Sequence, residues 1–168
     1  WHMHQTFREK SVIPRPLLPQ LEKIAKMIHS DYVIKQGEQR KGASPELRDW
    51  DELPGDIKYS NLSQARHISE KLRVIGCGIA AADSGCTPLE ELEPAEIESL
   101  SILEHERWMA ERRASGWTLG AKKDPEKKCT PYLVPWEDLS EQVRDLDRDA
   151  VRNIIPLLGR VGLIAYRK

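Results

Sequence analysis

The sequence predicts a mainly α-helical protein in which two similar halves pack as one compact domain about a pseudo-twofold axis, with only short extended segments. The first observation is an internal repeat: laid over itself at an offset of 86 residues, the chain matches without a gap. The identities pair Trp50 with Trp136, Leu53 with Leu139, Arg66 with Arg152, Ile68 with Ile154, Leu72 with Leu158 and Gly76 with Gly162. Two similar units that cannot each bury an apolar face alone usually pack on one another.

The second observation is an upstream register of 76 residues, which places His29 on His105 and Tyr32 on Trp108. The ten residues by which the offsets of 76 and 86 differ must lie between Trp108 and Trp136. We therefore expect a longer loop in the second half, and a cleft between the halves that equivalent residues line twice.

Helical periodicity supports this fold class in the first half. Three prolines make residues 11–19 an extended lead-in, and a polar stretch over 37–49 predicts a loop. Between them, one helical face carries Leu21, Ile24, Ala25, Ile28 and Tyr32. Asn61 and Gln64 together form a capping-box pattern, which predicts a helix with Asn61 as the N-cap. That helix should end at Gly76, a suitable C′ residue.

The second half repeats the plan. Pro94 suits the first position of a helix, and Gly116 should end it. Asp147 is the expected cap of the last helix, which should bend near Pro156 because its ring displaces a backbone hydrogen bond. Short extended pieces are expected at 117–119, 132–134 and 163–166. The predicted organisation is listed by range: 1–10, a lead-in that includes a cloning remnant; 11–82, the first half; 83–93, a connector; and 94–168, the second half.

Composition excludes several classes of function. Lys and Arg number 26 against 27 Asp and Glu, so the chain lacks the basic field that binding of duplex nucleic acid requires. The apolar stretch at 74–82 is too short for membrane insertion. Three cysteines without a CxxC pair favour a reducing compartment. We therefore expect a cytoplasmic location, and other domains of a larger parent protein as neighbours.

An ordered series in the second half resembles the ryanodine receptor repeat, the RyR domain. The series consists of His105, Trp108, Gly116, Trp117, Gly120, Lys128, Pro131, Leu133, Val134, Pro135, Trp136, Leu139, Asp147 and Arg148. The first half is similar to the first member of the paired repeats of animal calcium channels, through Ile28, His29, Asp31, Tyr32, Leu53, Pro54, Asn61, Leu62 and residues 72–78. The resemblance covers roughly residues 17–166 and identifies the chain as a tandem pair of prokaryotic type.

This resemblance implies a mainly helical pseudo-twofold module without catalytic activity. In the animal family the paired repeats are associated with adenine nucleotides, bound between the halves on aromatic residues that match Tyr32 and Trp108. The sequence departs from that pattern at Tyr32, where the animal proteins have Trp, and at Cys129 and Thr130, which stand in place of the usual His.

A purine site needs flat apolar faces, polar groups at the base edge and cations for phosphate. These needs are met by one aromatic ring from each half, an amide that hydrogen-bonds the base edge, a capping carboxylate, and a cation one helical turn beyond the second ring. The predicted ligand-binding residues are Tyr32, Trp108, Asn61, Arg112, Asp147, His29 and His105. Each has a structural alternative, as core aromatic, helix cap, solvated charge or core histidine. No metal-ligand spacing is present, and no cofactor is expected.

The sequence thus predicts a non-catalytic sensing module that binds an adenine-containing nucleotide or nucleotide-derived messenger between the halves and regulates an attached effector or channel. The alternative is a docking scaffold for other proteins, with Trp50, Trp117 or Trp136 as surface anchors. A nucleotide-processing enzyme is a weaker third reading, because no nucleophile stands beside a base with an oriented partner.

Overall fold

The computed structural model describes residues 12–36 and 45–168 and is mainly helical. The helices are α1 (Leu21–Gln36), α2 (Gly55–Val74), α3 (Pro94–Ala114), α4 (Glu141–Arg152) and α5 (Ile154–Arg160). The strands are β1 (Cys77–Ala81), β2 (Thr118–Leu119), β3 (Cys129–Thr130) and β4 (Leu163–Arg167). Short 3₁₀ turns are η1 (Leu18–Gln20), η3 (Pro45–Leu47), η4 (Trp50–Glu52) and η5 (Trp136–Asp138). Helix dominance therefore confirms the coarse fold class.

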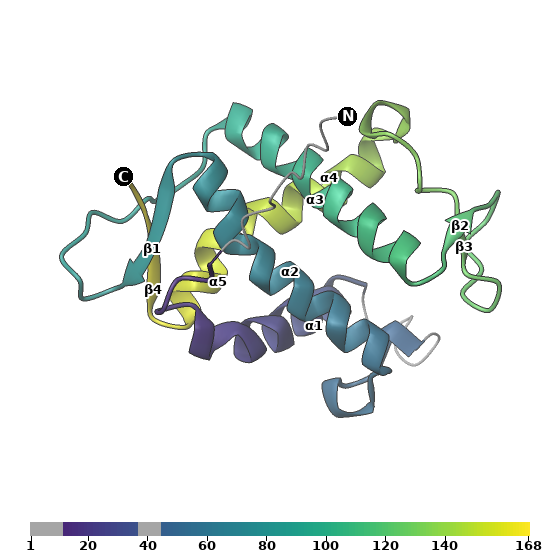
Figure 1. Ribbon diagram of the computed structural model, residues 1–168, viewed down its shortest axis with the longest axis horizontal. Coiled ribbons are helices and arrows are strands. Elements are labelled where there is room, and N and C mark those ends of the chain that lie inside the picture. Colours follow the sequence, from purple (N-terminus) through teal and green to yellow (C-terminus); the bar gives the residue numbers. More distant parts are fainter. Residues whose placement is uncertain (1–11, 37–44) are drawn as a thin grey trace, which may run out of the picture.

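One apolar cluster joins elements from both ends of the chain. Helix α1 buries Leu21, Ile24 and Ile28, which share one helical face, as predicted. They belong to the same cluster as residues of α2, β1, α5 and β4. A smaller cluster contains Leu100 of α3 and Val151 of α4. The principal packing pairs are α1 on α2 and α3 on α4 (Figure 1).

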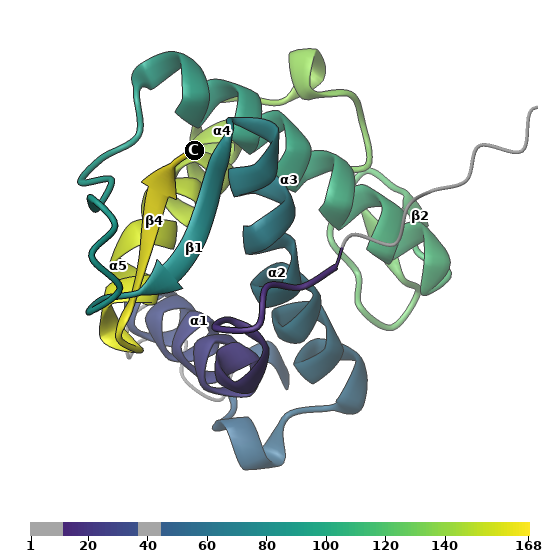
Figure 2. The same cartoon turned by 60° about the vertical axis from the view of Figure 1, so that its left-hand side comes forward.

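Strands β1 and β4 form an antiparallel two-stranded ribbon at one end of the molecule, opposite the loop that carries β2 and β3 (Figure 1). Turning the molecule brings this ribbon forward, beside α2 and α5 (Figure 2). Ile79 lies opposite Ala165 at the middle of the ladder, so the central pair is separated by the same 86 residues as the sequence repeat. The piece expected at 163–166 is confirmed as β4, whereas β1 was not predicted.

The ends of the ribbon are held by two matching backbone hydrogen bonds. The amide of Ala82 donates to the carbonyl of Gly162 at 2.9 Å, and the amide of Lys168 donates to the carbonyl of Gly76 at 3.0 Å. Both glycines have a positive φ, +75° and +74°, which ordinary side chains disfavour. The prediction that Gly76 ends a helix is confirmed, because α2 stops at Val74.

Two predicted helix caps are wrong. Helix α2 begins at Gly55, so Asn61 lies inside it and donates from Nδ2 to the carbonyl of Ile57 at 3.2 Å. Pro54, whose φ is fixed at a helix-compatible value, stands at the start instead. Similarly, α4 begins after Ser140, whose hydroxyl accepts from the amide of Val143, and Asp147 lies in the middle of that helix. Both side chains are therefore released from capping.

The remaining boundaries give mixed results. Helix α3 begins at Pro94 and ends two residues before Gly116, as predicted. The expected bend near Pro156 is confirmed as a break at Asn153 between α4 and α5, because proline cannot donate the next helical hydrogen bond. The extended piece at 117–119 corresponds to β2, whereas 132–134 is not a strand and β3 precedes it. Of the loop predicted over 37–49, residues 37–44 lie outside the described residues, and η3 forms at 45–47.

Within the ranges that the structure describes, none of the helices combines the length and apolar character needed to cross a bilayer.

Candidate functional site

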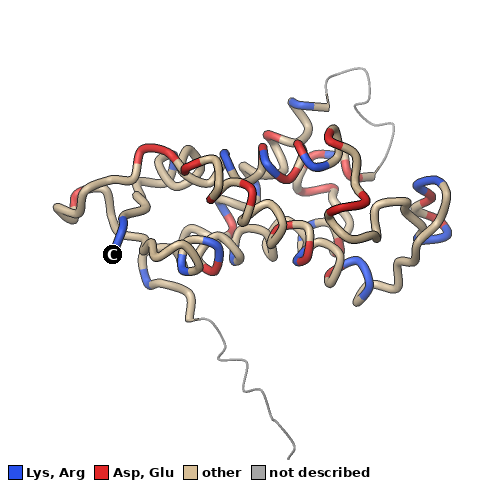
Figure 3. The backbone as a smooth tube through the Cα atoms, turned by 90° about the horizontal axis from the view of Figure 1, so that it is seen from above, with Lys and Arg blue, Asp and Glu red and all other residues tan. Residues whose placement is uncertain are grey.

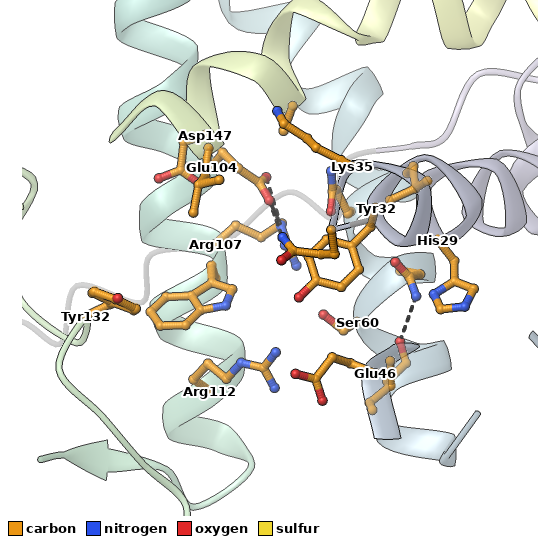
Figure 4. A pocket seen from close by; sticks show the side chains of 18 of the residues that line it. His29, Tyr32, Lys35, Glu46, Ser60, Glu104, Arg107, Arg112, Tyr132 and Asp147 are labelled. Atoms are coloured by element: carbon orange, nitrogen blue, oxygen red, sulfur yellow. Dashed lines mark hydrogen bonds and ion pairs between the residues drawn. The ribbon is translucent and has the colours of Figure 1, made fainter. Parts of the chain in front are cut away.

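A cleft of about 1040 Å³ opens between elements of both halves. Helices α1 and α2 form one side, while α3, α4 and the loop after α3 form the other (Figure 4). All seven residues predicted from the sequence line this cleft: His29, Tyr32, Asn61, His105, Trp108, Arg112 and Asp147. The structure thus brings the predicted set together, although the assigned capping roles of Asn61 and Asp147 were wrong.

The two histidines have a structural role that the sequence left open. His29 and His105 are both buried, and each Nε2 lies within hydrogen-bond distance of a backbone carbonyl, of Arg48 and Val134 respectively. Because a carbonyl only accepts, Nε2 carries the proton in each ring. Each ring also lies 6.2 Å from a tryptophan, at matching tilts of 58° and 55°. The histidines therefore tie their helices to the following 3₁₀ turns at the cleft wall.

The tryptophans that hold these histidines are Trp50 and Trp136. Trp50 is half-buried against the main apolar cluster, and Trp136 is 8% exposed. These two side chains lie in the body of the protein and not on an outer face.

Aromatic surface in the cleft comes from both halves. Trp108 is half-buried and Tyr32 is 39% exposed, and the described residues form no ring contact between them. They are thus neither packed against each other in a solid interior nor placed on separate surfaces. The His105 ring stacks on Trp108 at a centroid distance of 5.9 Å. The Trp108 ring on which a planar ligand would stack is therefore already oriented by His105.

Arg112 lies against the same aromatic group. Its guanidinium carbon is 5.7 Å from the Trp108 ring centre and 5.2 Å from that of Trp117. Among the described residues that line the cleft, only Arg112 and Lys128 are cations without a carboxylate partner within ion-pair distance. Lys128 donates to the carbonyl of Ser115 at the end of α3. Two cations that no described carboxylate neutralises thus line the cleft, and Arg112 is the one that lies against Trp108.

Other charges in the cleft are paired across it. Lys123 in the loop after α3 contacts Glu46 at 3.0 Å, and Lys35 of α1 contacts Asp149 of α4. Along the described backbone, Lys and Arg positions are interspersed with Asp and Glu positions (Figure 3). The site therefore favours a ligand whose negative charge is local.

A buried charge network forms the floor of the cleft between α2 and α3. Lys71 donates to Glu104 at 2.7 Å, and both side chains are almost fully buried. Arg107 binds Glu104 through two nitrogens and reaches Glu111 at 2.7 Å. Burial alone would raise the pKa of the Glu104 carboxyl, but Lys71 and Arg107 outweigh it and lower that pKa to about 2.

Asp147 faces this network from α4. Its side chain is 19% exposed, and Oδ2 lies 3.9 Å from Nδ1 of His105. Burial, followed by repulsion from Glu104, raises the pKa of the Asp147 carboxyl from 3.8 to about 7. Figure 4 shows Asp147 and Glu104 beside each other at one end of the cleft, with Arg112 at the other end.

Sequence reasoning missed the network. Neither Lys71 nor Glu104 is among the site residues predicted from the sequence. The internal repeat contains a signal that could have revealed this network. The two registers place Lys71 on Leu157 and Glu104 on Ile28, which are both buried and apolar. A charge at a position whose counterpart is a core residue indicates a buried partner.

The chemistry available here is recognition by stacking, hydrogen bonding and ion pairing. Within the described parts of the chain, no three His, Cys, Asp or Glu side chains gather closely enough to hold a metal ion.

Comparison with known families identifies the part of the chain that carries most of this cleft wall. The family model of the RyR domain matches residues 84–165, which include α3, the loop after it, α4 and α5. The resemblance noted in the second half is therefore confirmed: residues 84–165 match a RyR domain.

Proposed function

We propose that the cleft binds an adenine-containing nucleotide or a nucleotide-derived messenger, and that the chain is a non-catalytic cytoplasmic sensing module. The observation that carries this proposal is the convergence of Tyr32, Trp108 and Arg112 on one cleft between the halves. Half-exposed rings offer faces to a base, and Arg112 and Lys128 offer charge-assisted hydrogen bonds to phosphate. A local anionic group beside a flat base matches this arrangement.

The proposal includes a tandem pair of RyR repeats of prokaryotic type, related by a pseudo-twofold axis. Three observations support it, each recurring at the offsets of the sequence repeat. The histidine-to-carbonyl bonds recur at His29 and His105, the 3₁₀ turns begin at Trp50 and Trp136, and the central ladder pair of the ribbon is separated by 86 residues. An axis through that ribbon would lie between equivalent surfaces on the two sides of the cleft.

Binding between the halves would favour one arrangement of them and pass that change to an attached effector or channel. The charged side chains that bridge the cleft, Lys123 with Glu46 and Lys35 with Asp149, come from different halves. A ligand that brings its own phosphate charge competes for these cations and so changes the contacts between the halves.

Docking of another protein is the alternative function. It would favour tryptophans on an outer face, since aromatic side chains dominate interface energetics. Trp136 is buried, and Trp117 lies under Arg112 in the cleft. These positions support ligand binding over docking.

The test is thermal unfolding of the full chain with ATP, ADP and cyclic dinucleotides, together with mass spectrometry of small molecules released from the purified protein. A ligand at a hundredfold excess over its Kd adds about 2.7 kcal/mol to the stability of the native state. We expect a clear rise in Tm, which Trp108→Ala and Tyr32→Ala reduce. Tyr59→Ala is the matched control, because Tyr59 is 61% exposed and lies outside the cleft. A broad nucleotide panel without any rise would contradict the proposal.

The phosphate role of Arg112 has its own comparison. Arg112→Gln should lower the affinity for ATP by about tenfold or more, because one charge-assisted hydrogen bond contributes roughly 1.5–3 kcal/mol. The same change should leave the affinity for adenosine within about threefold of the original value. Arg113→Gln is the control, since Arg113 is exposed and does not line the cleft. An equal loss for ATP and adenosine would assign Arg112 to ring orientation instead.

A further inference from the structure

Among the buried and half-buried carboxylates that line the described cleft, Asp147 differs from the others in having no lysine or arginine partner; Asp56, which also lines the cleft, is exposed. Asp31, Glu46 and Asp149 each form an ion pair with a lysine or arginine. No donor among the described residues hydrogen-bonds the Asp147 carboxyl, and the one ionisable partner within ion-pair distance of it there is the His105 ring, whose Nδ1 lies 3.9 Å away. A largely buried carboxyl without a donor is costly to keep ionised.

The groups around Asp147 are already balanced without its charge. Lys71 of α2 and Arg107 of α3 are the cations, and Glu104 and Glu111 of α3 are the carboxylates that they bind. His105 supplies Nδ1, which bears a lone pair when Nε2 donates to the carbonyl of Val134. A negative charge on Asp147 would therefore face Glu104 and a lone pair, which favours the protonated form.

The position of Asp147 in the repeat suggests a function for the proton on its carboxyl. Asp147 falls on Asn61 at the offset of 86, and both side chains line the cleft. The Asn61 amide has two N–H donors and gives one to the carbonyl of Ile57, which leaves one N–H donor beside its carbonyl acceptor. A protonated carboxyl likewise presents one O–H donor and one carbonyl acceptor. The two residues thus offer the same hydrogen-bonding pattern only when Asp147 is neutral.

We propose that Asp147 takes up a proton in the cleft near neutral pH and, in its protonated form, is the residue that selects adenine over guanine. This inference rests on the proposed nucleotide site. The adenine edge has an amino donor beside a ring acceptor, which complements a donor and acceptor pair. The Watson–Crick edge of guanine has two adjacent donors, from N1 and the exocyclic amine, which complement an ionised carboxylate.

The pH dependence follows from the same pairing. The pKa of the Asp147 carboxyl is raised to about 7 by burial and by Glu104. Below neutral pH the neutral carboxyl favours adenine, and above it the carboxylate favours guanine. At pH 7, where the free carboxyl is partly protonated, binding of adenine takes up part of a proton from solvent, while binding of guanine releases part of one.

The experiment measures Kd for ATP and GTP on the full chain between pH 5.5 and 8.5. Only the ratio of the two constants is used, because the triphosphate titrates alike in both nucleotides. We expect the preference for ATP to fall by about tenfold or more as the pH rises. Asp147→Asn should hold the low-pH preference at every pH. Asp149→Asn, a neighbouring ion-paired carboxyl in the same cleft, should follow the unmodified protein.

Calorimetry of the unmodified protein at pH 7, in two buffers of different ionisation enthalpy, gives a second measurement that needs no variant. The expected result is a more positive proton uptake for ATP than for GTP. A flat ratio, equal uptake for both nucleotides, or loss of ATP binding in Asp147→Asn at low pH would overturn the assignment of Asp147 while nucleotide binding stands. Failure of the unmodified protein to bind either nucleotide would overturn both proposals.

Discussion

Two helix interfaces of the protein, α2 with α3 and α1 with α5, occupy equivalent positions in the repeat and are built from opposite chemistry. Between α2 and α3, Lys71 and Glu104 form a buried ion pair at 2.7 Å. At the offsets of 86 and 76, the counterparts are Leu157 of α5 and Ile28 of α1, which belong to the main apolar cluster. The same backbone plan thus accommodates either a charged pair or an apolar pair.

The difference shows what each interface depends on. An apolar pair contributes in proportion to the surface that it removes from water. A buried ion pair gains little net stability, because desolvation offsets the attraction, but removal of one partner leaves a charge without compensation. The α2 and α3 interface should therefore tolerate paired replacement and not single replacement.

The largest expected effect comes from Lys71→Leu. It leaves Glu104 with one cation instead of two in a site from which water is excluded, and we expect a loss of about 3–5 kcal/mol in the free energy of unfolding. Urea denaturation at pH 7 measures it. The double variant Lys71→Leu with Glu104→Ile, which installs the residues of the other interface, should recover much of that loss. If the single change costs no more than about 1 kcal/mol, the network is more hydrated than the structure indicates.

The next effect concerns Asp147 in the free protein. Its carboxyl has a pKa of about 7 when folded and 3.8 unfolded, so between these values only the folded state holds the proton. The contribution of Asp147 to the free energy of unfolding is therefore greatest below pH 4 and falls as the pH rises toward 7. Asp147→Asn should gain roughly 2–4 kcal/mol over the original protein at pH 8, at about 1.4 kcal/mol per pKa unit, and little at pH 4.

Denaturation curves for Asp147→Asn across this pH range provide the measurement. Asp149→Asn is the matched control, because the Asp149 side chain is 45% exposed and already paired with Lys35 and Arg152. A gain that stays constant with pH would show that packing, and not ionisation, causes it.

A smaller effect with the opposite sign is expected at His67, which lies beside the network on α2. Burial, and then repulsion from Lys71, lowers the pKa of its imidazole from 6.5 to about 4, and its Nδ1 is buried without a hydrogen bond. The unfolded state takes up this proton first, so stability is lost as the pH falls from 6.5 to 4. Asn153 is the counterpart of His67 at the offset of 86, so His67→Asn installs the residue of the other half. It should remove about 1–2 kcal/mol of the acid-induced loss in the free energy of unfolding, after allowance for solvent screening.

The comparison at pH 8 isolates packing for the His67 variant, because the imidazole is neutral in both states there. Equal acid sensitivity of the variant and the original protein would assign the loss to other groups, such as Glu104.

The smallest effect is expected at the exposed side of the cleft. Lys35 and Asp149 bridge α1 and α4 with both side chains about half exposed. Lys35→Ala should change the free energy of unfolding by less than about 1 kcal/mol, and added salt should remove that difference. Thermal unfolding at low and high salt checks this. A larger loss that salt does not remove would show that this exposed pair behaves like the buried pair of Lys71 and Glu104.

The repeat made the general arrangement predictable. Because two registers relate the halves, residues at matched positions such as Tyr32 and Trp108 were expected to line one cleft, and the structure places them there. Helix ends marked by Pro94 and Gly76 were also predictable, since each has a backbone requirement of its own.

The errors arose where local patterns compete with tertiary contacts. Asn61 matches a capping pattern, but Pro54 starts the helix earlier. Lys71 and Glu104 look like solvated positions, because helical periodicity assigns charges to the outer face. Strand β1 has no alternation of polar and apolar residues, and it was missed although the offset of 86 carries the predicted strand at 163–166 onto it.

The ribbon of β1 and β4 has a consequence for assembly. The partner of β1 arrives 86 residues later, so the ladder closes a long loop and its formation is expected to be slow. Until then, the edge of Cys77–Ala81 accepts any strand of the same sequence as Leu163–Arg167, including that of a second molecule. Exchange of β4 between two chains would preserve every hydrogen bond of the ladder, which makes a domain-swapped dimer the expected product of refolding at high protein concentration.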